Sequence, residues 1–558
     1  MSKRNAVLVV IGLLASVAVV VAVLLRKPQQ TAGGTTDPAE FLPDRCQAVF
    51  VVPDPGRLGE HLGVLPRLKV ADLLASTQNY PNAEALLSDL AKQAGLDPRS
   101  RESLRQNGID PSRPLVGYLS EQGVPLALVP ISEQKKFEEK FAKSAAARLG
   151  DQPPVTEKVG ADRTLTVLTG RGENPQVLAW AYLGGYALLT QSQAGLALLK
   201  AMLAGKVQGS LAKDSRFAAT RSRLADRDLF AFSCLDALPL QKQIFMPYGT
   251  TFAASLSEKE LRLSFELPLN DEWNEKLKSL ATPAGADLVA AMGPDAFLVG
   301  RLGGDPALLE PLLQRLMPMA IQRGLKDAGI DLAADILGNL KPGVAASLSL
   351  SHSARLSGVP ELDVRRTNPF DFVQLSVVGR TADASKAAKT LGSIVDVAPR
   401  FGARLEPADL GGTKVFVTRY HLGEGASLAL DGDKVLVTGG AGQMQAQLDR
   451  LRSPAPKDPA DPLAAKALKE DAAALWLDVS RLTAGVRALP DSAYGIGGWA
   501  IKAAVSRWLE AIDEITGLRL SARLADKTLS ADLALTLQLA PAPSAQAAPA
   551  DKASRANP

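Results

Sequence analysis

The chain has 558 residues, and its balance of 46% hydrophobic and 22% charged residues excludes wholesale disorder and favours two or more globular domains. Four basic residues near the N-terminus account for the whole formal net charge of +4: Lys3, Arg4, Arg26 and Lys27. The rest of the chain is therefore neutral on balance. This excludes the broad basic footprint that binding to nucleic acid requires.

The first element is an apolar run of 20 residues without a charge, from Ala6 to Leu25. As a helix at about 1.5 Å per residue, it would match the hydrocarbon thickness of a bilayer, about 30 Å. A cleaved signal peptide is the alternative, but such peptides have shorter apolar regions followed by small residues, whereas Arg26, Lys27 and Pro28 follow here. We therefore expect residues 1–27 to form an uncleaved transmembrane anchor, with the N-terminus inside and the rest outside the cytoplasm.

Two segments have the composition of flexible chain. Residues 28–43 are polar and rich in Gly, Thr and Pro, which predicts a spacer after the anchor. Residues 540–558 form an Ala- and Pro-rich tail that is expected to be disordered.

Only two cysteines are present, Cys46 and Cys234, and they lie far apart in the sequence. In an oxidising compartment they would be able to form a disulfide bond. Two buried free thiols are the alternative, because cysteine is among the residues most often buried. The sequence does not decide between these two states.

Seven segments of residues 44–270 resemble seven segments of residues 286–539 in the same order. The clearest match is a hairpin, Leu256–Leu269 with Leu524–Leu537, and an internal duplication is expected from this order. The other six matches pair Ala48–Val52 with Ala296–Gly300, Arg113–Val116 with Lys341–Val344, Leu126–Ile131 with Val373–Val378, Leu165–Leu168 with Val415–Thr418, Ala187–Thr190 with Val435–Thr438, and Lys213–Leu238 with Lys457–Leu482.

Within each unit several strands follow one another directly, which predicts antiparallel pairing with helices on one face. The expected fold class is α+β: an N-terminal transmembrane helix followed by a tandem duplication of an antiparallel-sheet-plus-helices unit. The sequence leaves open whether the two units share one continuous sheet structure or form separate lobes.

The second unit contains an extra helical segment at about residues 496–515. Ile501, Val505, Trp508, Ile512 and Ile515 recur in it at helical spacing and predict an amphipathic stripe. Packing on its own unit is the first interpretation, and docking to a partner or to the bilayer surface is the alternative.

The apolar run of residues 244–248 raises the same question in the first unit. The candidate contacts with a partner or the membrane are therefore Trp499, Trp508, Phe245 and Tyr248.

No grouping of residues indicates catalysis. The three histidines, His61, His352 and His421, are isolated, whereas a catalytic zinc site needs three closely arranged ligands. The motifs of serine hydrolases and of phosphate-binding loops are also absent from the sequence. We therefore expect no catalytic residue, no cofactor and no metal site, and we do not expect an enzyme.

A family resemblance rests on the end of the first unit. Thr190-Gln191-Ser192 precedes a helix, and residues 210–217 (SLAKDSRF) lead to the strand that contains Phe230 and Phe232. Together with the anchor, this resembles bacterial membrane-anchored envelope proteins known only as a domain of unknown function. The resemblance implies a location in the bacterial envelope and supplies no active site.

The expected function is that of a non-enzymatic protein-binding or scaffolding module of the cell envelope. The N-terminal helix would hold it at the membrane, with the main domain in the periplasm or at the cell surface. The alternative is a module that binds a lipid or another apolar small molecule.

Overall fold

The structure is a computed structural model of the chain. It describes residues 36–94, 96–149, 153–159, 163–170, 176–207, 209–234, 247–317, 319–350, 373–401, 403–420, 423–440, 442–453, 462–489 and 498–539. The expected membrane anchor, residues 28–35 of the expected spacer and the expected disordered tail lie outside these residues.

Twenty strands form a single sheet, in which all the described pairs are antiparallel. The strands of the N-terminal half are β1 (Cys46–Val52), β2 (Leu115–Ser120), β3 (Pro125–Pro130), β4 (Val155–Val159), β5 (Arg163–Thr169), β6 (Val177–Leu183), β7 (Tyr186–Thr190), β8 (Leu229–Ser233), β9 (Thr251–Leu256) and β10 (Glu260–Pro268). Those of the C-terminal half are β11 (Ala296–Leu302), β12 (Leu340–Leu350), β13 (Val373–Thr381), β14 (Leu405–Leu410), β15 (Thr413–Tyr420), β16 (Gly423–Asp431), β17 (Lys434–Gly439), β18 (Ala473–Asp478), β19 (Ile515–Ala525) and β20 (Thr528–Leu537).

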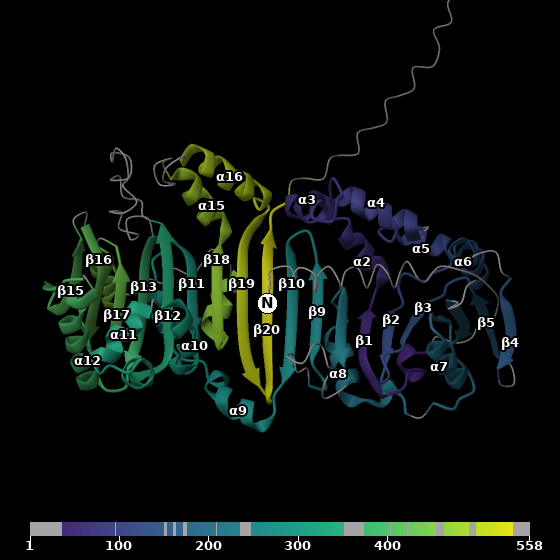
Figure 1. Ribbon diagram of the computed structural model, residues 1–558, viewed down its shortest axis with the longest axis horizontal. Helices are drawn as coiled ribbons and strands as arrows, with labels where there is room; N and C mark the ends of the chain where they lie inside the picture. Colours follow the sequence, from purple (N-terminus) through teal and green to yellow (C-terminus); the bar gives the residue numbers. More distant parts are fainter. Residues whose placement is uncertain are drawn as a thin grey trace, which may run out of the picture.

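The two halves meet where β10 pairs with β20, in the middle of the sheet (Figure 1). Outward from β10 the order is β9, β8, β1, β2, β3, β7, β6, β5 and β4. Outward from β20 it is β19, β18, β11, β12, β13, β17, β16, β15 and β14. Strand order is therefore the same on the two sides of the central pair.

Helices cover the sheet away from its centre (Figure 1). In the N-terminal half they are α2 (Pro55–Leu62), α3 (Lys69–Ser76), α4 (Ala83–Ala94), α5 (Arg101–Gln106), α6 (Gln134–Leu149), α7 (Gln193–Leu203) and α8 (Ser215–Arg223), with 3-10 turns η1 (Pro38–Glu40), η2 (Leu65–Arg67) and η3 (Leu211–Lys213). In the C-terminal half they are α9 (Asp271–Leu277), α10 (Glu310–Leu316), α11 (Met319–Asp327), α12 (Ala384–Val397), α13 (Gln443–Arg452), α14 (Pro462–Glu470), α15 (Val479–Ala488) and α16 (Gly498–Ala511). Short turns there are η4 (Lys278–Ala281), η5 (Ala286–Ala291), η6 (Pro306–Leu309), the π-turn η7 (Leu332–Ile336), η8 (Leu337–Asn339) and η11 (Ala398–Phe401).

The expected fold class is wrong as it was stated. The described residues form one continuous sheet of twenty strands, whereas the expectation was an anchor followed by a sheet-plus-helices unit repeated in tandem. Among the described helices, none is both long enough and apolar enough to cross a membrane. The physical reason is the β10–β20 pair, because two edge strands with unpaired backbone groups join when they meet, and no local pattern in the sequence reports that pairing.

The turn between β19 and β20 shows how local sequence sets this region. Asp526 and Lys527 both have positive φ, 47° and 57°, and connect strands that pair from Ala525 with Thr528 onward. A two-residue turn of this kind matches the twist of the strands that it joins. The hairpin is thus fixed by its turn and presents β20 to β10.

In the N-terminal half, buried side chains form a core on each face of the sheet. Phe230 and Phe232 of β8 belong to the core on one face, together with Phe217 of α8. Trp180 and Leu189 belong to the core on the other face. This half therefore has the three-layer packing of a stable domain.

A disulfide bond joins Cys46 and Cys234, whose Cα atoms are 5.3 Å apart. Cys46 begins β1 and Cys234 follows β8, and these two strands pair directly. Both cysteine side chains are buried in the core of the N-terminal half. The bond therefore closes a long loop at the strand pair on which this half is built.

We expect the double change Cys46→Ser and Cys234→Ser to lower the free energy of unfolding by about 2–5 kcal/mol, because the unfolded chain loses a long covalent loop. Urea denaturation of the wild type and the variant measures the difference. In dithiothreitol the two proteins should unfold at the same urea concentration. Equal stability without reductant would contradict a structural role for the bond.

Candidate functional site

The strands at the centre of the sheet have one apolar and one polar face. In β10 the residues Leu261, Leu263, Phe265 and Leu267 alternate with charged or hydroxyl residues. Directly paired residues share a face, and Leu263 pairs with Ala254 of β9 and Leu533 of β20. We call the middle of this apolar surface the seam face and define it by six residues: Phe252, Leu263, Phe265, Leu518, Leu520 and Leu533.

The opposite face of the same strands is polar and paired. Asp532 of β20 accepts hydrogen bonds from Arg262 (3.0 Å) and Ser264 (2.6 Å) of β10. Burial raises the pKa of Asp532, but these bonds and the nearby arginine charge outweigh it and hold the pKa below its ordinary value. Arg519 of β19 reaches across to Glu260 of β10 at 3.2 Å. These pairs fasten the two halves on the face away from the seam face.

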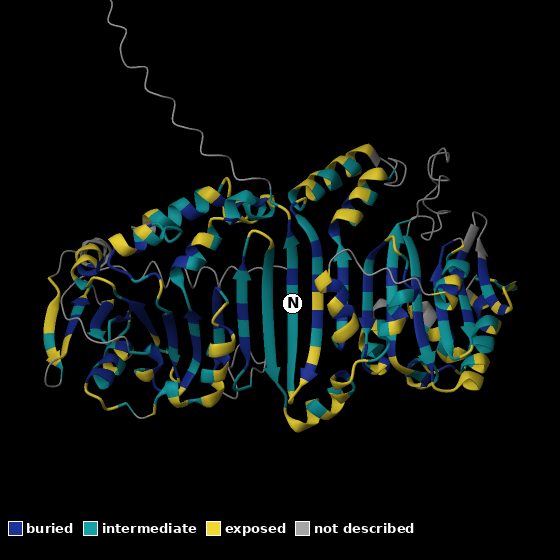
Figure 2. Cartoon of the chain, turned by 180° about the vertical axis from the view of Figure 1, so that it is seen from behind, coloured by how far each residue is buried: buried dark blue, intermediate teal, exposed yellow. Residues whose placement is uncertain are grey.

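Small apolar clusters close the two ends of the seam face. At one end, Val64 and Leu68, which flank η2, pack with Leu256 and Leu537. At the other end, Leu280 of η4 packs with Leu524. Between these clusters, five of the six seam residues are only half-buried and Leu520 is 44% exposed. None of the described helices crosses β10 or β20 in the view from either side (Figures 1 and 2).

On its N-terminal side the seam face borders a covered surface, whereas the same side of β18, β11, β12 and β13 is also half-buried, at Leu477, Leu298, Leu348 and Leu375. Leu229 of β8 lies on the same side of the sheet, because it pairs with Ala254, and belongs to the fully buried core that contains Val129, Trp180 and Leu189. The apolar side chains on this side of the sheet therefore change from buried at β8 to half-exposed at β10, two strands away. A patch of this kind on a folded protein typically marks a surface that contacts another molecule.

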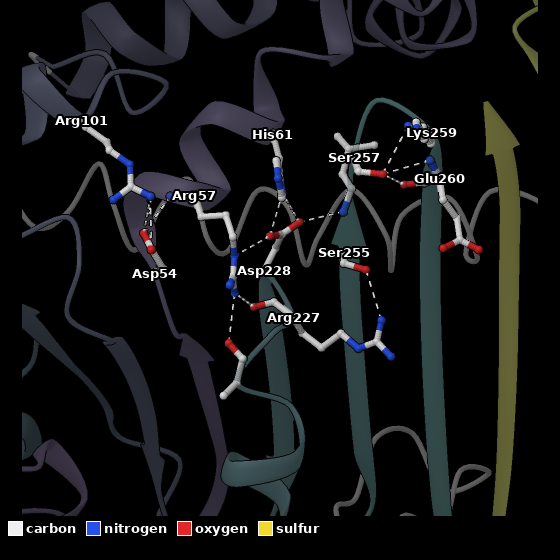
Figure 3. Close-up of polar contacts among 12 residues, drawn as sticks. Asp54, Arg57, His61, Arg101, Arg227, Asp228, Ser255, Ser257, Lys259 and Glu260 are labelled. Atoms are coloured by element: carbon white, nitrogen blue, oxygen red, sulfur yellow. Dashed lines mark hydrogen bonds and ion pairs between the residues drawn. The ribbon is translucent and has the colours of Figure 1, made fainter. Parts of the chain in front are cut away.

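A buried carboxylate holds the helices at one end of the seam face (Figure 3). Asp228, only 2% exposed, accepts hydrogen bonds from the backbone N–H of Leu256 (2.7 Å) and pairs with Nδ1 of His61 (2.8 Å). The Nε atom of Arg57 lies 3.4 Å from the same carboxylate. Arg57 and His61 are four residues apart, so both side chains leave α2 on one face.

Asp228, Arg57 and His61 form a cluster that we call the clamp. It holds in place the apolar cluster at this end of the seam face, which we call the cap. The chain runs from α2 through η2, and Val64 and Leu68 beside η2 supply the apolar cluster at that end. A second ion pair ties α2 to α5, because Arg101 contacts Asp54 at the start of α2 at 3.2 Å (Figure 3). Among the described residues, no hydroxyl or thiol is hydrogen-bonded to His61, so the geometry supports a clamp and not a hydrolytic triad.

The residues proposed from the sequence as contacts lie in three environments. Trp499 and Trp508 are exposed on α16, by 73% and 64%. Tyr248 is half-buried, packs edge-on against Phe232 and donates a hydrogen bond to Asp214. Phe245 lies outside the described residues. The structure therefore places Trp499 and Trp508 on the same exposed helix, on opposite sides of it, and places Tyr248 on the core.

A cavity of about 360 Å³ lies where β1 ends and β2 begins. Its charged residues already have partners: Arg113 stacks on Tyr186 at 4.4 Å, and Arg221 pairs with Asp37 at 2.5 Å. No cluster of three or more His, Cys, Asp or Glu residues in the described part of the chain is arranged to hold a metal ion. His352 and His421 lie outside that part.

Comparison with known proteins supplies no relative: no protein-family model, no curated protein and no solved structure matches the chain. The seam face was also not singled out from the sequence. Alternation in residues 256–269 and 524–537 indicated two-faced strands, but it carries no signal that one face stays uncovered.

We expect Asp228→Asn to lower the free energy of unfolding by about 1–3 kcal/mol, because the amide leaves Arg57 and His61 facing a neutral group. Urea denaturation at neutral pH measures this, and hydrogen exchange in α2 should accelerate. Asp226→Asn is the matched control, since its side chain is 75% exposed and the change should stay within about 0.5 kcal/mol. Equal losses in the two variants would contradict the clamp.

Proposed function

We propose that this chain is a membrane-associated protein whose folded body lies outside the cytoplasm and binds another protein through the seam face. The observation that carries the proposal is the half-exposed apolar surface across β9, β10, β20 and β19, with Leu520 of β19 44% exposed. The body would act as a scaffold, without chemistry of its own.

The disulfide bond supports the location. Structural disulfides persist in oxidising compartments and are rare in the cytosol, so the Cys46–Cys234 bond favours a body outside the cytoplasm. The apolar run of residues 6–25 lies outside the described residues and supports the membrane association through its sequence. The resemblance to bacterial envelope proteins stays a prediction in agreement with both.

The shape of the seam face favours a protein over a small molecule. Four strands at about 4.8 Å spacing and about six residues of rise give an apolar area on the order of 400 Å², open on the side away from the sheet. Small molecules are typically held in clefts that enclose most of their surface. An open apolar patch beside polar helices is more typical of the core of a protein interface.

A lipid or another apolar small molecule is the second candidate, and the same half-exposed leucines favour it. An acyl chain lying along the strands between the two end clusters would also remove this surface from water. Native mass spectra of the purified protein distinguish the two, because a lipid ligand adds a discrete mass to the folded protein.

We expect a photo-crosslinking residue at Leu520 to capture a protein partner in cells, because this side chain is the most exposed of the seam face. The matched control is the same residue at Leu312 of α10, which is 52% exposed but lies away from the seam. Affinity purification followed by mass spectrometry identifies the product.

Leu520→Asp should then abolish co-purification of the same partner while lowering stability by no more than about 1 kcal/mol. Crosslinks that form equally at both positions, or a partner retained by the folded Asp variant, would contradict binding at the seam face. If no protein is captured and native mass spectra show an added lipid mass, the seam face binds lipid, as the second candidate states.

A further inference from the structure

The most exposed large apolar side chains on a single described helix lie on α16. Trp499 is 73% exposed, Ile501 45% and Trp508 64%, although the helix has only 14 residues. Val505, Leu509 and Ile512 are half-buried, and Ile515, the first residue of β19 after the helix, joins the cluster that contains Val64 and Leu68. Trp499 and Trp508 are nine residues apart, so they leave α16 on opposite flanks, and Ile501 shares the flank of Trp508.

The exposed surface of α16 lies at one long edge of the sheet. The helix precedes β19 and contacts α3, on which Leu74 is 43% exposed. Figure 1 shows α3, α4, α15 and α16 along the same edge. Four of the exposed large apolar residues of the described chain therefore gather there: Leu74, Trp499, Ile501 and Trp508.

The described chain begins at this same edge. Thr36 lines the cavity beside Pro53, which follows β1, and Pro114, which precedes β2. The edge at which β1 ends is also the edge at which β19 begins, five strand spacings or about 24 Å away. Residues 26–35 connect Leu25 to Thr36, and ten residues reach at most about 36 Å.

We propose that this edge rests on the surface of a lipid bilayer, with Trp499, Ile501 and Trp508 inserted at the level of the headgroups. This inference rests on the proposed membrane association, because a membrane-inserted run ending at Leu25 keeps Thr36 and its edge within reach of the bilayer.

The chemistry of the edge favours lipid over another protein. Tryptophan prefers the boundary between headgroups and acyl chains, where its ring is buried and its N–H stays wet. Arg507 is exposed on the same helix, as is Glu510, and Lys69 of α3, 58% exposed, pairs with Glu514 at 3.7 Å. Cations beside an apolar helix surface are typical of helices that lie on anionic membranes.

The test uses the full chain reconstituted with vesicles of phosphatidylcholine and phosphatidylglycerol whose acyl chains carry bromine, a short-range quencher of tryptophan fluorescence. We expect quenching in the wild type and its loss in the double variant Trp499→Phe, Trp508→Phe. Trp273→Phe is the matched control, because Trp273 is 53% exposed on α9 at the opposite edge of the sheet, and this variant should keep the quenching.

The outcomes separate this inference from the proposed function. If the chain sediments with the vesicles but Trp499 and Trp508 are not quenched, the docking of the edge is overturned and the membrane association stands. If the chain does not sediment with the vesicles, both are overturned. If the wild type forms a dimer without lipid and the double variant is monomeric, the edge binds a second copy of the chain and the proposal fails.

Discussion

The pairing of β10 with β20 is the interaction on which the rest of the structure depends. Nine residue pairs, from Glu260 with Thr536 to Pro268 with Thr528, join two ten-stranded halves into one sheet. An unpaired strand at either position would leave a row of backbone donors and acceptors in water and invite aggregation. The pairing satisfies the backbone but leaves the side chains between two sets of helices. The seam face follows from this arrangement, because the N-terminal half covers its own strands on that side and no buried core of either half extends over the junction.

At equivalent places the two halves bury side chains of opposite charge. At the start of β8 the buried carboxylate of Asp228 binds His61 and the N–H of Leu256. The residue before β18 is Ala472, also buried, and there the guanidinium of Arg301 donates to the backbone carbonyls of Ala284 and Asp471. The C-terminal half therefore packs without a buried carboxylate at the position of Asp228. We attribute Asp228 to its contacts with α2, the helix that leads to the cap of the seam face.

Local elements could be predicted from the sequence to a large extent. The hairpin of residues 524–537 and the helix of residues 498–511 are set by alternation, by turn residues and by helical spacing, all of which act over a few residues. The expected end of that helix was wrong, because Ile515 begins β19. The joining of the halves could not be predicted, because it depends on two edges more than 250 residues apart in the chain. The cysteine pair was left open for the same reason, since only the pairing of β1 with β8 brings Cys46 beside Cys234. The alternation that buries one side of a strand also says nothing about whether a helix arrives to cover it, so the seam face had no signal of its own.

The two proposed surfaces differ in direction, and this decides whether one molecule can use both. The seam face points along the normal of the sheet, whereas α16, which carries Trp499 and Trp508, lies at one edge of it. A body resting on a bilayer by that edge holds its sheet upright, so the seam face stays in water and remains open from the side. The clamp of Asp228 lies where the two surfaces meet, because α2 leads both to the cap of the seam face and to α3, which contacts α16. Loosening the clamp would therefore disturb the edge and the face together, and under the two proposals it would couple the position of the body on the membrane to the seam face.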